Sequence, residues 1–165
     1  MRALTRFALA AAATAMATAP AASFAVTSAV AENGGTFLPF ASVLRRCDFS
    51  TLDYYDAFGD GRPTATVRSG GGQVTADVQL ATAKPYSSYQ VRLIQMPRKS
   101  SDGCHAGAFG TAVADLRTDV AGAGAVTLSA PLMPGATGAW VAVERPQPGA
   151  QWPVEFYSSD FIAKV

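Results

Sequence analysis

Apolar and polar residues alternate with a period of two along most of the chain after residue 62. In the clearest run, 74–80, valine, alanine and leucine take every second position and polar residues take the others. Because successive side chains of a strand point to opposite faces, this pattern predicts a strand with one buried face. Residues 64–68 alternate in the same way, and Ser69-Gly70-Gly71-Gly72 lies between the two runs. Glycine adopts the positive φ that short hairpin loops need, so we expect the two strands to pair antiparallel.

Further strand-like runs follow, separated by clusters of glycine, proline, serine and aspartate that favour turns. These runs lie at 89–94, 111–118, 125–130, 139–145 and 154–165. Short strands at this spacing, without a long helical stretch, predict an all-β fold, an antiparallel β-sandwich.

The segment 37–58 shows no clear period. We expect a strand over 43–49, which would carry Cys47 into a sheet, and a short helix over 50–58. Residues 32–42 are expected to form a loose N-terminal segment.

The first 31 residues have the order of a secretory signal peptide. Arg2 and Arg6 come first, an alanine-rich apolar run follows at 7–22, and small residues end at Ala31. This order predicts export. A membrane-spanning helix needs about 20 strongly apolar residues, and polar residues and a proline interrupt this run, so no stable transmembrane segment is expected after cleavage. Cleavage after Ala31 would leave a single β-sandwich domain over 32–165.

The exported part is expected to be nearly neutral, because the leader holds two of the 13 basic residues while all 12 acidic residues follow it. Scattered charge of both signs lacks the basic footprint of a nucleic-acid-binding protein. We therefore expect a protein or envelope component as partner, and a secreted or envelope-associated location outside the cytoplasm.

Cys47 and Cys104 are the only two cysteines. In an oxidising exterior, this count predicts one intramolecular disulfide. The bridge would span 57 positions, for which the loss of chain entropy in the unfolded state corresponds to about 4 kcal/mol. A redox pair would need a Cys-x-x-Cys spacing, which the sequence lacks.

Leu80, Pro85 and the Tyr-x-Val-x-Leu order that begins at Tyr89 form one short motif. It resembles the tyrosine corner of fibronectin type III and related immunoglobulin-like domains. In that family the tyrosine hydroxyl bonds to upstream backbone and fixes the crossing between sheets, so the resemblance implies an immunoglobulin-like sandwich with Tyr89 as its structural corner. The alanine-rich leader, single disulfide and sandwich pattern also resemble small exported actinobacterial proteins of unknown function, which implies a location and no activity.

Candidate catalytic groups are few. His105 is the single histidine and lies near Ser100, Ser101 and Asp102, but residues this close in sequence do not easily form a catalytic triad. Asp115 has apolar neighbours in the sequence, which can indicate a perturbed catalytic carboxylate. A position on the solvent-facing side of a strand accounts for the same pattern without a catalytic role. We expect no catalytic residue and a protein that is not an enzyme.

One histidine and two bridged cysteines do not supply the ligands of a transition-metal site. Calcium needs only oxygen, and Asp53, Asp56 and Asp60 form the densest cluster of such ligands. Phe58, however, occupies the third position of an EF-hand loop that would begin at Asp56. We interpret these acids as solvating a turn beside buried Tyr54, Tyr55 and Phe58, and expect no metal or cofactor.

Aromatic residues concentrate near the C-terminus, and the candidate ligand or partner surface consists of Trp140, Trp152, Phe156 and Tyr157. Trp152 ends a proline-rich loop, and loops on a rigid sandwich commonly carry recognition. The alternative is that these aromatic residues fill the core, where large apolar side chains are mostly found.

Taken together, the patterns favour a non-enzymatic binding or structural protein. Two alternatives remain open. One is a carrier that holds a lipid or small apolar ligand in a cavity of the sandwich. The other is an extracellular hydrolase without a recognisable motif.

Overall fold

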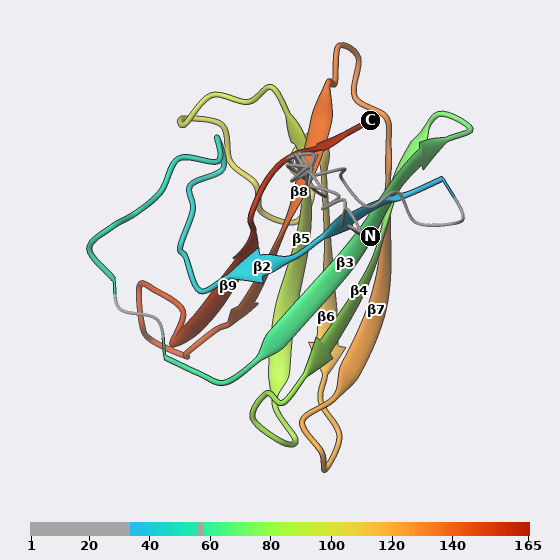
Figure 1. Ribbon diagram of the computed structural model, residues 1–165. Helices are drawn as coiled ribbons and strands as arrows, with labels where there is room; N and C mark the ends of the chain where they lie inside the picture. The colour runs from blue at the N-terminus through green and yellow to red at the C-terminus, as the bar shows by residue number, and fades with distance from the viewer. Residues whose placement is uncertain (1–33, 56–57) are drawn as a thin grey trace, which may run out of the picture.

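The structure, a computed structural model, describes residues 34–55 and 58–165, and this part of the chain is all-β with ten strands and no helix (Figure 1). The strands are β1 (Thr36–Leu38), β2 (Phe40–Ala41), β3 (Arg62–Gly70), β4 (Gln73–Ala81), β5 (Ser88–Met96), β6 (Thr111–Arg117), β7 (Gly124–Pro131), β8 (Gly138–Arg145), β9 (Glu155–Ser159) and β10 (Ala163–Lys164). Within this part, no helix is long and apolar enough to cross a membrane. The signal peptide predicted for residues 1–31 lies outside the described residues.

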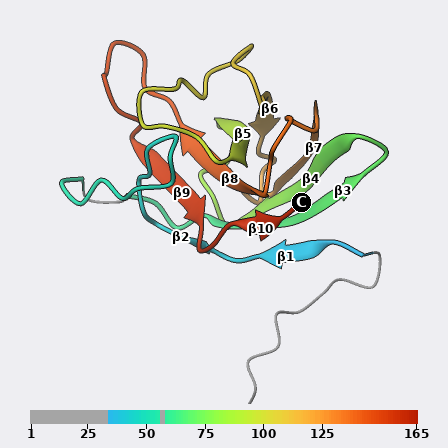
Figure 2. The ribbon, with the colours of Figure 1, turned by 90° about the horizontal axis from the view of Figure 1, so that it is seen from above.

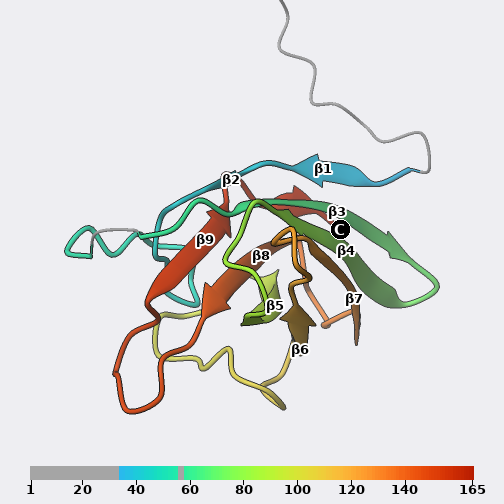
Figure 3. The same ribbon diagram turned by 90° about the horizontal axis from the view of Figure 1, so that it is seen from below.

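The strands form two antiparallel sheets that face each other. One sheet has the order β1-β3-β4-β7, and the other has the order β2-β9-β8-β5-β6 with β10 paired to β8. Figures 2 and 3, which are turned by 90° from Figure 1, show β3 and β4 in one layer and β5, β8 and β9 in the other. The predicted antiparallel β-sandwich is therefore confirmed.

The predicted hairpin joins β3 to β4. Their ladder runs from Arg62 opposite Ala81 to Gly70 opposite Gln73. Gly71 and Gly72 form the turn with φ of 59° and 76°. Positive φ at both central residues suits the twist of a tight hairpin, which explains the glycines between the two alternating runs.

The main core lies between the sheets, where the apolar set of each alternating strand points inward. Its buried members come from both layers: Val67, Val74, Val78, Leu80, Tyr89, Val91, Leu93, Val141 and Val143 are among them. Because these side chains are each at most 2% exposed, the space between the sheets is filled by the protein's own residues.

A second, smaller core lies on the outer face of the β5–β8–β9 sheet. Ile94, Trp140 and Ala142 point to this side and are buried with Cys104. The covering comes from two loop segments, 42–55 and 97–110, which the Cys47–Cys104 disulfide joins with a Cα–Cα distance of 5.6 Å. The predicted disulfide is present, and its structural effect is to hold these loops over the sheet.

The N-terminal predictions need correction. Residues 32–42 were expected to be loose, yet β1 joins one sheet and β2 the other, with Pro39 between them. The strand expected over 43–49 and the helix expected over 50–58 are wrong for the described residues, which form an irregular loop with one bridge between Arg45 and Thr51. The reason is that the apolar side chains of this loop pack onto the outer face of a finished sheet, as the edge-to-face contact of Phe49 with Trp140 at 5.4 Å shows.

Candidate ligand-binding site

Of the four residues predicted to form an aromatic surface near the C-terminus, Trp152 alone is exposed. Trp140, Phe156 and Tyr157 are at most 3% exposed, whereas Trp152 is 40% exposed. The strands β8 and β9 are interior strands of their sheet, and loops cover the sheet's outer face, so aromatic side chains on both faces are buried. The structure places these three residues where the core alternative expects them.

The groups weighed for catalysis do not come together. His105 is exposed, and its ring Nδ1 lies 2.9 Å from the carbonyl oxygen of Ala106. Asp102 instead accepts a hydrogen bond from the backbone amide of Lys99. Asp115 is exposed on β6, on the wet face of its strand.

Of the three acids weighed as calcium ligands, Asp56 lies outside the described residues. Across 34–55 and 58–165, no group of three His, Cys, Asp or Glu side chains is arranged to hold a metal ion. Tyr54, Tyr55 and Phe58, expected to be buried, are 90%, 36% and 66% exposed. These three aromatic rings are therefore presented to solvent.

A pocket of about 510 Å³ opens beside the disulfide on the outer face of the sheet. Most of its walls come from three loop segments, 42–55, 97–110 and the β8–β9 loop 146–154. Figures 2 and 3 both show these loops gathered on the side of the sheet that faces away from β3 and β4. We call this the outer-face pocket; its volume falls in the range of small-molecule sites, about 300–1,000 Å³.

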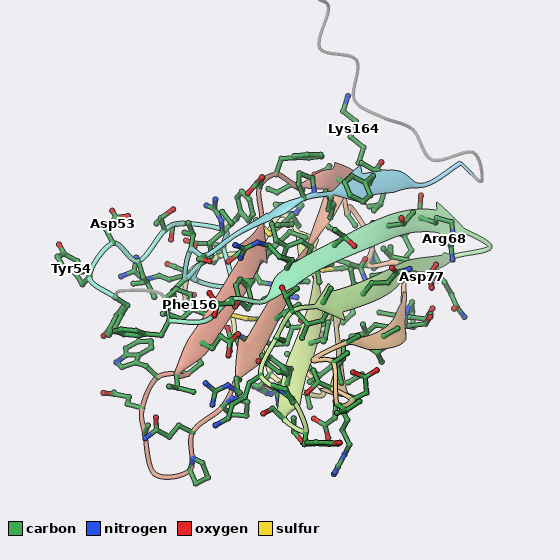
Figure 4. All side chains as sticks on the ribbon, turned by 60° about the horizontal axis from the view of Figure 1, so that its bottom comes forward. Asp53, Tyr54, Arg68, Asp77, Phe156 and Lys164 are labelled. Atoms are coloured by element: carbon green, nitrogen blue, oxygen red, sulfur yellow. A yellow bond between two sulfur atoms is a disulfide. The ribbon has the colours of Figure 1, made fainter. Side chains whose placement is uncertain are left out.

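Aromatic rings form the rim of the outer-face pocket. Tyr55 and Trp152 come from different loops, and their ring centroids lie 4.7 Å apart with planes tilted by 44°. Tyr54 also lines the pocket, and Figure 4 shows it with Asp53 on the loop that projects beyond the sandwich. The sequence indicated Trp152, but the adjacent tyrosines were missed; their place in a long segment without strand periodicity was the available signal.

An ion pair forms part of the pocket's lining. Arg92 on β5 and Glu144 on β8 project from the outer face, and the Arg92 Nη2 atom is paired with the Glu144 carboxylate. The other terminal nitrogen, Nη1, lies 3.7 Å from the Cys104 sulfur. The two side chains are 18% and 14% exposed, so this pair is shielded from water more than a surface pair.

Two further arginines line the pocket. The Arg45 guanidinium lies 4.0 Å from the centre of the Phe49 ring, and its Nη1 donates to the Phe49 carbonyl and the Thr51 hydroxyl, each at 3.1 Å. Arg46 is exposed, and its side chain makes no hydrogen bond or ion pair with the described residues. With the Arg92–Glu144 pair balanced, the lining carries an excess of two positive charges.

A buried polar cluster lies on the inner face of the same sheet. Glu155 is 1% exposed. One carboxylate oxygen accepts hydrogen bonds from the Tyr89 hydroxyl and the Arg145 Nε, both at 2.8 Å, and the other accepts from the Tyr157 hydroxyl at 2.6 Å. Tyr89 also accepts a hydrogen bond from the backbone amide of Lys84, five residues upstream, at 3.2 Å.

The chain entering β3 closes this cluster. The Gly61 amide donates to the Tyr157 hydroxyl at 2.7 Å, and a Cβ at Gly59 would lie 2.4 Å from the Glu155 carboxylate. Burial and the hydrogen bond to Glu155 raise the pKa of Tyr89 to about 12, and the same causes raise the pKa of Tyr157. Because the carboxylate is fully partnered and enclosed, the cluster stabilises the fold and offers no open ligand site.

Comparison with protein-family models, with curated proteins and with solved structures found no match, so the outer-face pocket must be interpreted from its own chemistry.

Proposed function

We propose that this chain is a non-enzymatic binding protein that acts outside the cytoplasm and takes its ligand in the outer-face pocket. The observation that carries the proposal is the exposed aromatic rim on a rigid base. Tyr55 and Trp152 meet above the disulfide-bearing face of a sheet whose central strand, β8, is almost entirely buried. Rigid strands with recognition loops at one face are a common arrangement of binding sites.

The exposed aromatic residues support this interpretation. Tyr54, Tyr55 and Trp152 expose 90%, 36% and 40% of their surface, and all three line the pocket. Single exposed apolar residues are ordinary, but aromatic rings that gather around a pocket are typical of interaction sites.

The disulfide supports the extracellular part of the proposal. It is consistent with an oxidising environment, and it closes the two loops that form much of the pocket wall. Residues 1–31 carry the predicted export signal, which agrees with the same location.

The alternatives have less support. A carrier of a lipid or apolar ligand would need space between the sheets, where the side chains of the main core are packed. A hydrolase would need convergent catalytic groups, and the described contacts of His105 involve only backbone.

A screen of small soluble fragments by ligand-observed NMR tests the proposal. Wild-type protein is compared with Trp152→Leu, and Phe109→Leu serves as the control because Phe109 is 71% exposed and does not line the pocket. We expect fragments that bind wild type and the control but not Trp152→Leu. If no fragment shows dependence on Trp152, the pocket is not a binding site and the proposal fails.

A further inference from the structure

We infer that the ligand of the outer-face pocket is a small molecule with a ring that bears an acidic group, either a sugar acid or an aromatic acid. This inference rests on the proposed function and adds the chemistry of the ligand. It depends on two observations that occur together in the outer-face pocket: exposed aromatic faces and an excess of guanidinium groups, in a volume of about 510 Å³.

The charge of the lining indicates an anion. Arg92 is balanced by Glu144, while Arg45 and Arg46 have no carboxylate partner. Asp48 and Asp53 lie on the same loop as Arg45 and Arg46 but do not line the pocket, and Asp48 accepts hydrogen bonds from the amide and hydroxyl of Ser50. Hydrogen bonds from Ser50 and, to a smaller extent, the charge of Arg46 lower the pKa of Asp48, so Asp48 offsets the charge of Arg46 in part. The lining itself still carries an excess of positive charge, and a concave site concentrates such a field.

The donor capacity of these arginines is only partly used. A guanidinium offers five N–H donors in a planar fork that fits a carboxylate or phosphate. Arg45 uses one terminal nitrogen on Phe49 and Thr51, and exposed Arg46 uses none within the described part. An acidic group on the ligand would supply the missing acceptors.

The aromatic rim indicates a ring next to the acidic group. Trp152 and Tyr55 are tilted rather than stacked flat, so each keeps ring surface that is not covered by the other. Such faces pack against the C–H face of a sugar or against another aromatic ring. The volume of the pocket suits one or two rings and not a lipid chain with its headgroup or a folded partner.

Two matched pairs of probes test the inference by ligand-observed NMR. Methyl β-glucuronide is compared with methyl β-glucoside, and benzoate with benzamide, so that each pair differs in the acidic group while the ring is kept. We expect at least one acid to bind more tightly than its neutral partner, with affinity that falls as salt is raised from low to physiological concentration because the pocket is open to solvent. The pair that responds identifies the ring as sugar or aromatic.

Arginine variants test whether the preference for acids comes from the pocket. Arg46→Gln should weaken binding of the acid about two- to five-fold, as expected for one partly exposed charge contact, and should leave the neutral partner unaffected. Arg117→Gln is the control, because Arg117 is exposed on β6 and does not line the pocket. Arg46 makes no contact that the fold requires, so the variant is expected to fold.

The outcomes separate the inference from the proposed function. If neutral probes bind as well as acids and the binding is lost in Trp152→Leu, the pocket binds ligands but the acidic preference is wrong. If neither acids nor neutral probes show dependence on Trp152, the proposed function fails and the inference fails with it. Acid binding that is unchanged in Arg46→Gln and insensitive to salt also overturns the inference.

Discussion

Removal of the Cys47–Cys104 bridge offers a quantitative test of how the outer face is stabilised. The bridge spans 57 positions, and a loop of this size restricts the unfolded chain by about 4 kcal/mol. Net stabilities of single domains are about 5–15 kcal/mol, so the variant Cys47→Ala/Cys104→Ala should lose a large share of its stability. The bridge also holds two loops over Ile94 and Trp140, and their release should expose this smaller core before the main one.

Urea unfolding measures the effect, with tryptophan fluorescence reporting on Trp140 and Trp152, which both lie at the outer face, and far-ultraviolet circular dichroism reporting on the sheets. We expect the free energy of unfolding to fall by about 3–4 kcal/mol and the fluorescence transition to precede the loss of strand signal. His105→Ala is the control, because His105 is the exposed neighbour of Cys104 and should change stability by less than about 0.5 kcal/mol. A loss below about 1 kcal/mol with coincident transitions would refute the reasoning, since the loops would then be held by packing alone.

Three further predictions concern the buried polar cluster. Glu155→Gln removes a buried carboxylate that is paired with the partly buried Arg145 and accepts hydrogen bonds from two tyrosines, and it should cost about 1.5–3 kcal/mol in urea unfolding. Tyr89, with a pKa of about 12, should ionise late in an absorbance titration at high pH, and Tyr89→Phe should reduce this late component and leave the part that belongs to Tyr157. Because the folded state keeps the tyrosine proton that the unfolded state loses near pH 10, stability should be fully retained below pH 10 and fall between pH 10 and about 12. Gly59→Ala should cost about 2–3 kcal/mol, since its Cβ would lie 2.4 Å from the Glu155 carboxylate at a φ of +130°.

These three predictions have separate controls. Gly149→Ala also places alanine at positive φ, +76°, but meets no atom within 4 Å, so it should cost only about 1 kcal/mol. Equal losses at both glycines would contradict the close packing against Glu155. A loss below about 1 kcal/mol for Glu155→Gln would show that the carboxylate contributes little as a charge, and a titration unchanged by Tyr89→Phe would contradict the burial of its hydroxyl.

The elements that could be predicted are those encoded by near neighbours in the chain. Alternation over 74–80 and the glycines that precede it indicate a hairpin without reference to any distant residue. The two cysteines indicate the disulfide by count alone. The loop segment 42–55 could not be predicted in this way, because side chains such as Phe49 pack on a surface that other strands build, and its local pattern carries no period of its own.

The candidate site shows the same division. Trp152 was identifiable because a proline-rich loop presents it, whereas Trp140, Phe156 and Tyr157 look equally suitable in the sequence and are buried by strand order and loop cover. Arg92 and Glu144 lie 52 positions apart in the chain, and only the pairing of β5 with β8 brings them together.

The sequence by itself determined that this chain forms antiparallel strands with one buried face, a tight glycine hairpin and a single disulfide, because each of these follows from side-chain period, backbone freedom or cysteine count. Only the tertiary structure decided that one sheet is covered on both faces, that Glu155 is bonded by three side chains, and that aromatic rings and arginines from distant segments share one pocket. These features depend on which distant segments become neighbours, and packing in three dimensions selects those neighbours.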